Sequence, residues 1–355
     1  YYSVTLTKGT GISAVSNGGT VTEEAVQYLY NSEAENGPQD IAIDSTVIEG
    51  YTWSSWTKTS GTNLATITAG TKSQNVKMGA GAAVYTANAT YTASVTITRS
   101  DYNTFTYTAP SGAAYYVSTS STAPTAGTTA ASTTFVLNTN NTGTWTTALN
   151  TGDLNLTEGT TYYVWVKDSV TGGNVSTNKA SIAVHKMTRS EGTGSTLTTG
   201  RDGTSASSAG TAVTDATTLV LHGTPFWSKA VAKTGYNTPV LKEGTTTRTA
   251  SGYKIVVNSD VTISSTATAN TYTVEFYQGN NSTTAGATKL GEQTFTYGQA
   301  QNLTTYANLG GAVPTPGGWS FYGWTDNNGT TSTTRKYTNG QSVSNITTTN
   351  NGVRS

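Results

Sequence analysis

The feature that most constrains the fold of this chain is a glycine-led aromatic cluster that occurs twice. Residues 50–57 read GYTWSSWT and residues 318–325 read GWSFYGWT, so both follow the pattern Gly, aromatic, x, aromatic, x, x, Trp, Thr. On a strand, side chains two positions apart share a face, but the closing Trp stands three positions further on. It reaches the same face only if the strand bends, and we expect that bend at Ser54–Ser55 and at Tyr322–Gly323.

The spacing of the cluster predicts an internal repeat. Three pairs of residues have nearly the same separation along the chain: Tyr2 and Tyr51 at 49 positions, Met187 and Tyr236 at 49, and Tyr272 and Trp319 at 47. A Gly-Thr-Gly follows the first two opening strands, at 9–11 and 192–194. We therefore predict three copies of a unit of about 85–90 residues. The middle copy is divergent, because Thr238 and Leu241 replace its second and third aromatics.

A different pattern separates the first copy from the second. Between residues 91 and 186, seven short segments rich in Thr, Tyr and Val follow one another, divided by Gly, Pro, Asn and Asp. Their spacing of roughly 8–12 residues is that of a β-sandwich. We therefore predict four domains: a repeat-like β module at 1–90, a β-sandwich at 91–186, a divergent repeat-like module at 187–270 and a closing repeat module at 271–355.

Composition favours a mainly β fold with little helix. Thr and Tyr favour strands, and the 38 glycines supply turns. The hydrophobic content of 34% is low enough for disorder, yet disordered chains lack the β-branched and aromatic residues that are abundant here. Apolar residues alternate in 3–7, 41–48 and 82–90, as in half-buried strands. One short helix is expected at 22–30, where apolar residues fall on one helical face.

Two roles are open for the aromatic cluster. A unit this small buries little surface, and each buried aromatic removes ~150–250 Å² from water, so the rings can supply the core of each module. Alternatively, exposed rings can form a platform that stacks on sugars. We favour the core, because every copy needs an interior of its own. The candidate residues for either role are Tyr51, Trp53, Trp56, Trp319, Phe321 and Trp324.

The last quarter of the chain contains YTVEFYQ, TFTYGQAQNL, GGWSFYGWT and RKYTNGQSV between residues 272 and 343. This order resembles the Listeria–Bacteroides repeat, the internalin-type B-repeat of bacterial surface proteins. YSVTLTKGTGI and EGYTWSSWT give the first segment a similar resemblance. The resemblance implies small β-grasp-like modules with one helix that act as spacers or adhesive units. Residues 91–186 resemble immunoglobulin-like or fibronectin-type-III-like domains through TTYYVWVKDSVTGGNVS.

The charge balance argues against two classes of partner. Lys and Arg together number 19, as do Asp and Glu, so the formal net charge is zero. Phosphate binding needs an excess of Lys and Arg, which argues against nucleic acid and against an anionic membrane surface. No stretch of the sequence is long and apolar enough for a membrane span. The chain opens on a strand-like segment without a visible leader, so we interpret it as a processed product or an excised segment.

No motif in the sequence predicts catalysis or a cofactor. The two histidines, His185 and His222, fall in different predicted domains, and without cysteine a zinc site has no evident partners. We interpret both as surface or edge residues. Five acids are interpreted as a helix start or a solvated loop: Glu23, Glu24, Glu33, Glu35 and Asp40. We therefore expect no enzyme activity, no metal site and no cofactor.

Two weaker patterns remain. Asp153 and Asp168 are candidates for calcium in the predicted sandwich, whereas DNNG at 326–329 is better explained as a hairpin turn. An isopeptide bond in the sandwich would join a lysine and an asparagine, and the spacing does not favour it over ordinary surface side chains. The pairs concerned are Lys167 or Lys179 with Asn174 or Asn178.

These features are typical of an extracellular segment of a bacterial surface protein. We expect a non-catalytic stalk, spacer or adhesin at the cell surface, whose partners are other domains of the same protein. Two alternatives remain open: a subunit that self-associates into a filament or surface layer, and a carbohydrate-binding region attached to an enzyme. The corresponding partners are further copies of the chain, glycans, or proteins of a host or cell surface.

Overall fold

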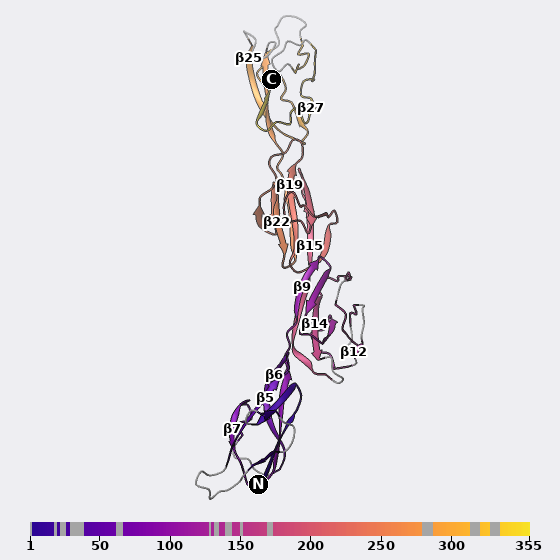
Figure 1. Cartoon of the computed structure of the whole chain (residues 1–355). Coiled ribbons are helices and arrows are strands. Elements are labelled where there is room, and N and C mark those ends of the chain that lie inside the picture. The colour runs from indigo at the N-terminus through magenta and orange to yellow at the C-terminus, as the bar shows by residue number, and fades with distance from the viewer. Residues whose placement is uncertain are drawn as a thin grey trace. The chain divides into compact units, whose positions relative to one another are not determined.

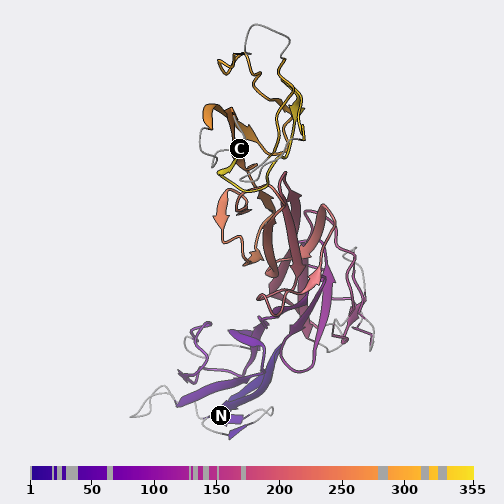
Figure 2. The ribbon, with the colours of Figure 1, turned by 90° about the horizontal axis from the view of Figure 1, so that it is seen from above.

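The computed structural model describes most of the chain. The described residues are 2–17, 20–21, 26–28, 39–61, 67–127, 129–130, 135–138, 144–149, 152–168, 173–278, 287–312, 320–326 and 334–355. Every regular element within these ranges is a strand, drawn as an arrow in Figures 1 and 2, which confirms the mainly β fold. The chain divides into two compact units, unit one at residues 1–184 and unit two at residues 185–355.

The first segment of unit one, residues 2–91, contains two four-stranded sheets. One has the order β4–β1–β8–β6, formed by β1 (Tyr2–Lys8), β4 (Val26–Tyr28), β6 (Tyr51–Gly61) and β8 (Ala83–Tyr91). The other has the order β3–β2–β5–β7, formed by β2 (Ile12–Asn17), β3 (Thr20–Val21), β5 (Asp40–Val47) and β7 (Gln74–Lys77). Alternate side chains of the long strands point inward and share one core, which includes Leu6, Val15, Ile43 and Trp56.

The helix expected at 22–30 is wrong where the structure describes this region. Val26–Tyr28 forms β4, which pairs antiparallel with β1. This pairing satisfies backbone N–H and C=O groups on the outer edge of β1, and the long-range gain overrides a local helical pattern. The remaining residues of the expected helix lie outside the described part of the chain.

The second segment of unit one, residues 92–184, also contains two sheets. The smaller is a hairpin of β9 (Thr96–Asp101) and β10 (Thr104–Thr108). The larger has the order β12–β13–β11–β14–β15, formed by β11 (Ala113–Ser118), β12 (Thr129–Ala130), β13 (Trp145–Thr146), β14 (Thr161–Asp168) and the first part of β15 (Val175–Glu191). Aromatic rings fill the space between the sheets: Phe105 lies 6.0 Å from Tyr162, and Tyr107 lies 4.6 Å from Tyr115, between ring centroids.

The third segment, residues 185–270, opens unit two with two more sheets. One has the order β17–β16–β19–β22, formed by β16 (Ser195–Arg201), β17 (Thr211–Ala212), β19 (Thr224–Ala232) and β22 (Tyr253–Val257). The other joins the last part of β15 to β18 (Thr217–Leu221), β20 (Val240–Glu243), β21 (Thr246–Arg248) and β23 (Val261–Thr266). Leu197, Phe226, Leu241 and Ile263 are almost fully buried in its interior.

The fourth segment, residues 271–355, has fewer strands. One sheet has the order β25–β24–β28, formed by β24 (Thr271–Gln278), β25 (Thr288–Thr296) and β28 (Gly352–Arg354). A short pair consists of β26 (Gln301–Asn302) and β27 (Ser342–Val343). The core of the segment includes Tyr272, Phe276, Phe295 and Leu303.

The same pairing opens and closes three of the four segments. β1 runs parallel to β8 over five residue pairs. The last part of β15 runs parallel to β23 over five pairs, and β24 runs parallel to β28 over three. The first strand of each of these segments therefore lies beside its last strand, and the chain enters and leaves at opposite ends of one parallel ladder.

The first and third segments also share a contact between a glycine and a tyrosine. Gly11 has a φ of 74° and Gly194 a φ of 78°, a conformation that residues with a side chain rarely adopt. A Cβ atom at Gly11 would overlap the ring of Tyr51, and one at Gly194 would overlap the ring of Tyr236. Each glycine carbonyl also accepts a 2.9 Å hydrogen bond from the backbone three positions before that tyrosine. The first and third segments therefore share this local geometry.

Candidate functional site

The tryptophans of the first aromatic cluster pack into the first segment. Trp56 is 3% exposed, and its Nε1 donates to the carbonyl oxygen of Lys72 at 2.9 Å. Trp53 is half-buried, lies 5.5 Å from Trp56 between ring centroids, and donates from Nε1 to the carbonyl oxygen of Gly70 at 3.0 Å. Both indole N–H groups are therefore satisfied by the segment's own backbone.

A bulge in β6 brings these two rings together. The register of β6 against β8 shifts between Trp53 and Ser55, so one residue of β6 has no partner across the ladder. This shift confirms the bend expected at Ser54–Ser55. As a result, Trp56 enters the core beside Trp53 instead of facing the other side of the sheet.

In the third segment, Leu241 occupies the place that corresponds to Trp56 in the first segment. Trp56 pairs with Ala87, and Leu241 pairs with Ser265. Ala87 and Ser265 are each the last residue of the parallel ladder in their segment. Leu241 is 0% exposed. An aliphatic side chain fills the corresponding place, which favours the core role for this position.

The second aromatic cluster forms a group of rings in the fourth segment. Phe321 stacks on Tyr306 with ring centroids 4.5 Å apart. Trp324 lies 4.8 Å from both Phe321 and Phe276, and it is half-buried against the core. Trp319 lies outside the described residues. The described members of this cluster therefore contact other rings of the same segment.

Tyr322, between two members of the cluster, faces solvent instead. It is 68% exposed, and the guanidinium of Arg335 lies 4.6 Å from its ring centroid. Gly323 has a φ of 141°, and a Cβ there would overlap the carbonyl oxygen of Tyr337. An aromatic platform on the described part of this segment would have to use Tyr322, which the sequence pattern did not single out.

Tyr51 connects the first segment to the second. Its hydroxyl donates a short hydrogen bond to Oδ2 of Asp168 at the end of β14, and its ring lies 4.9 Å from that of Tyr91. Burial and the bond to Asp168 raise the pKa of Tyr51 to about 12. Burial and the charge of Asp168 raise the pKa of Tyr91 to about 12 as well. Asp168, a calcium candidate from the sequence, thus accepts a hydrogen bond from a neutral phenol.

Two further bonds fasten the linker between these segments to β15. Ser176 Oγ donates to the carbonyl oxygen of Ala93 at 2.7 Å. Asn178 Nδ2 donates to the carbonyl oxygen of Thr92 at 2.7 Å. The connection within unit one is therefore held by specific bonds on both sides of the linker.

A related connection occurs in unit two. The ring of Tyr236 lies 5.8 Å from that of Tyr297, and a Cβ at Gly235 would overlap the Tyr297 ring. The backbone N–H of Asn270 donates to the carbonyl oxygen of Gly235 at 2.8 Å. In each unit a tyrosine that follows a glycine, Tyr51 or Tyr236, therefore contacts the next segment.

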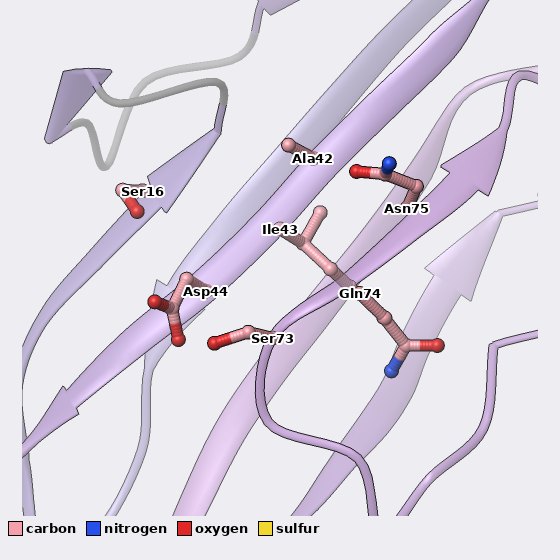
Figure 3. A pocket seen from close by; sticks show the side chains of 7 residues that line it. All are labelled: Ser16, Ala42, Ile43, Asp44, Ser73, Gln74 and Asn75. Atoms are coloured by element: carbon pink, nitrogen blue, oxygen red, sulfur yellow. The ribbon is translucent and has the colours of Figure 1, made fainter.

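An open polar hollow lies over β2, β5 and β7 in the first segment. Its volume is about 450 Å³, and its lining includes Ser16, Asp44, Ser73 and Gln74. Figure 3 shows the Asp44 carboxylate and the Ser73 hydroxyl close together, with Ser16 on the far side of the carboxylate. The Gln74 amide is already bonded to backbone groups of the neighbouring loop at 2.7–2.9 Å.

Asp44 is the one ionisable group among the residues that line this hollow. Burial would raise its pKa, but hydrogen bonds from Ser73 and from the N–H of Ser45, together with the charge of Lys72, hold the pKa of Asp44 below its usual value. The group is therefore an ionised carboxylate at neutral pH. Glycoside cleavage needs a second carboxyl group across the cleft, which this lining does not supply.

The two histidines, expected to lie apart, are neighbours in unit two. His185 on β15 and His222 in the turn after β18 approach to 3.1 Å between Nε2 and Nδ1. The expectation was wrong because β18 pairs with β15, which brings its following turn to His185. Burial and the neighbouring His222 lower the pKa of His185, against the opposing effect of Asp260.

Two of the other acids named from the sequence, Asp40 and Asp153, each form an ion pair or a hydrogen bond with a neighbouring side chain. Asp40 pairs with Lys77 at 3.0 Å, and Asp153 accepts a hydrogen bond from Thr104 Oγ1 at 3.1 Å. Across the described ranges, no group of three or more His, Asp or Glu side chains could hold a metal ion. Several residues lie outside those ranges: Glu23, Glu24, Glu33, Glu35 and positions 327–329 of the expected hairpin turn.

Lys167 is a buried cation, so its interpretation as a surface side chain is wrong. It is 1% exposed, and its Nζ donates to the carbonyl oxygens of Ala126 at 2.8 Å and Gly127 at 2.7 Å. The ammonium also lies 5.4 Å from the ring centroid of Trp145. Burial lowers the pKa of Lys167. Lys179, by contrast, is exposed and donates to a backbone carbonyl at 2.6 Å.

No family model, no curated protein and no solved structure matches this chain. Among the described residues, no helix has the length and apolar character to cross a membrane.

Proposed function

We propose that the chain is a non-catalytic stalk, spacer or adhesin segment of a bacterial surface protein, built to carry tension outside the cell. The observation that carries this proposal is the parallel pairing of the first and last strands in three segments: β1 with β8, β15 with β23, and β24 with β28.

This pairing decides how a pulling force reaches the backbone. The chain enters the first segment at the start of β1 and leaves it at the end of β8, which are opposite ends of the ladder. Tension along the chain therefore slides the two strands past each other and loads all five residue pairs together. If both ends lay at the same end of the ladder, the bonds would break one after another. A stalk or spacer under tension is therefore stronger when its two ends lie at opposite ends of the ladder.

Connections between segments give further support. In unit one, the bond from Tyr51 to Asp168 and the bonds to Thr92 and Ala93 restrict the linker. In unit two, the rings of Tyr236 and Tyr297 are in contact. A zero formal net charge and a surface rich in Thr and Ser limit unspecific attraction, which suits a spacer.

The proposal is tested by pulling single molecules of the full chain from both ends. The chain has no cysteine, so Tyr2→Cys and Ser355→Cys supply unique handles. We expect several separate unfolding steps, each releasing roughly 300 Å for a segment of about 85–95 residues. Extension at low force without steps would contradict a load-bearing role.

The filament alternative has one specific observation in its favour. The described sheets of the first and fourth segments end in β6 and β25, each of which pairs with a strand on one side only. Part of each outer edge is already occupied, because the N–H of Trp56 donates to the carbonyl oxygen of Ala69 and the N–H of Thr296 to the Gln301 side chain. An open strand edge can accept a strand of another copy. Light scattering across a range of concentrations tests this alternative, because it requires assemblies larger than the monomer.

The carbohydrate alternative depends on exposed rings, and the described part of the cluster offers Tyr322. Its ring is open to solvent while Arg335 lies beside it. If this surface binds glycans, polysaccharides should change the fluorescence of the chain, and Tyr322→Ala should remove that change. Trp53→Phe serves as the control, because Trp53 packs against Trp56.

A further inference from the structure

The chain has only two histidines, and the structure places their rings against each other. His185 comes from β15 and His222 from the turn between β18 and β19, 37 positions later. Their ring centroids are 5.3 Å apart with an angle of 55° between the planes. Nε2 of His185 lies 3.1 Å from Nδ1 of His222. The contact is a hydrogen bond in which one ring N–H donates to the lone pair of the other ring. An ion that binds both nitrogens would displace that proton, which leaves two lone pairs at the same small volume.

The spacing of these nitrogens fits a shared metal ion. Bonds of ~2.0–2.1 Å to a tetrahedral ion place two ligand nitrogens about 3.3–3.4 Å apart, and adjacent ligands of a square-planar ion lie about 2.9 Å apart. The observed 3.1 Å lies between these values. The distance between the two nitrogens therefore needs little change to admit an ion, while the rings must rotate until both lone pairs point at it.

A carboxylate stands behind His185 on the side away from His222. Asp260 Oδ1 lies 3.9 Å from Nδ1 of His185 and is held in place by the backbone N–H of Lys186 at 2.8 Å. In metal sites a carboxylate near the outer nitrogen of a ligating histidine fixes the proton there and frees the inner nitrogen for the metal. At 3.9 Å Asp260 is beyond hydrogen-bond distance, and a small movement of the ring or of the carboxylate would complete this contact.

We propose that His185 Nε2 and His222 Nδ1 together bind one divalent transition-metal ion, with Asp260 as a positioning residue. The His185 side chain is 16% exposed while His222 is exposed, so the ion would sit at the surface with water at its remaining positions. Imidazole ligands follow the usual order of affinity, which places copper(II) above zinc(II). This proposal does not depend on the proposed function.

The site would reinforce the third segment. His185 lies two residues before Met187, where the parallel ladder between β15 and β23 begins, and Asp260 directly precedes β23. An ion held by both histidines would link β15 to the turn after β18. Because the linked geometry exists only in the folded state, bound metal should stabilise the fold.

The experiment titrates copper(II) sulfate and zinc(II) sulfate into the full chain without an affinity tag, followed by calorimetry and by a thermal melt. We expect one ion per chain, tighter binding of copper, and a higher melting temperature of unit two. The copper spectrum in electron paramagnetic resonance should show coupling to two imidazole nitrogens.

Variants decide whether these two side chains form the site. His222→Gln changes an exposed turn residue and should weaken copper binding at least tenfold without changing the melting temperature of the metal-free chain. Asp260→Asn should weaken it less, and Asp215→Asn, an exposed acid in the same segment, should not change it. The proposal is overturned if no ion binds at millimolar copper, or if binding survives unchanged in His222→Gln and His185→Gln. In that case the two histidines form a hydrogen bond and no metal site.

Discussion

Replacing Trp56 with alanine should empty the centre of the first segment. The side chain is 3% exposed, and its indole N–H is bonded to the carbonyl oxygen of Lys72. Replacement of a buried tryptophan by alanine costs about 3–5 kcal/mol, which includes the cavity left behind. The carbonyl oxygen also loses its donor, for about 1 kcal/mol. We therefore expect the free energy of unfolding of this segment to fall by about 4–6 kcal/mol, a large part of the total stability of one domain.

Hydrogen exchange followed by mass spectrometry on the full chain measures this loss where it occurs. A loss of about 4 kcal/mol lowers the protection of amides in β1 and β8 by roughly a thousandfold, because each 1.4 kcal/mol is a factor of ten. Unit two should exchange as before. Trp53→Ala is the matched control. Because Trp53 is half-buried in the same cluster, this substitution should lower the free energy of unfolding by about half as much.

Two results would contradict a core role for Trp56. If Trp56→Ala left exchange in β1 and β8 unchanged, the indole would not be part of a stabilising core. If the same variant abolished binding of a polysaccharide at unchanged stability, the cluster would be a platform for ligands instead.

Three further perturbations follow from the contacts of single residues. Gly194→Ala should lower the melting temperature of unit two, for a cost of about 2 kcal/mol or more, since the backbone is left-handed and the Tyr236 ring occupies the Cβ position. The pKa of Tyr51 is about 12 in the folded chain, against an ordinary value of 10.0. The protonated phenol therefore contributes its full share to the free energy of unfolding below pH 10. This share is lost as the pH rises towards 12, because the unfolded chain releases the phenol proton first. Melts across this range should show that loss, and Tyr51→Phe should reduce it. Lys167→Met should cost about 1–3 kcal/mol in a urea titration, because the carbonyl oxygens of Ala126 and Gly127 lose the buried ammonium that donates to them. Lys179→Met at an exposed position is its control, and an equal cost for both would contradict the argument.

Strands were predictable from the sequence wherever alternation was regular. The segments at 3–7, 41–48 and 82–90 are β1, β5 and β8. When one face of a strand is buried, apolar and polar residues alternate along that strand. The residues of a single segment are therefore enough to predict the strand. The bend after Trp53 was also predictable, because three aromatic positions with odd spacing cannot share a face on a regular strand.

The expected helix at 22–30 shows where local reasoning fails. Its pattern of apolar residues allows a helical face, but β1 has an edge that needs a partner, and Val26–Tyr28 provides it. Nothing within nine residues of sequence reveals the open edge of a strand that lies elsewhere. Pairing across the sheet decides the conformation in such cases.

The histidine pair and the buried Lys167 were missed for a related reason. His185 and His222 meet because β18 pairs with β15, and this long-range pairing leaves no periodic trace at either residue. Lys167 follows the alternation of β14 onto the face of Tyr163 and Trp165, so its burial was readable in principle. Its charge suggested the surface, whereas the carbonyl oxygens that accept hydrogen bonds from its ammonium come from a loop about 40 residues away.

The central claim is that parallel terminal strands let each repeat-like segment resist tension, and a matched pair of pulling experiments tests it most directly. In the full chain, handles at Tyr2→Cys and Thr90→Cys pull from opposite ends of the ladder between β1 and β8. Handles at Thr10→Cys and Thr90→Cys pull from the same end. All three positions are exposed, so the fold is the same and only the direction of load differs.

We predict that the first pair of handles requires a clearly higher force to unfold the segment. In that geometry five residue pairs are loaded together, while in the second they open in sequence from Lys8 and Ala87. Equal unfolding forces for both pairs of handles would contradict the account, because the parallel ladder would then have no mechanical role.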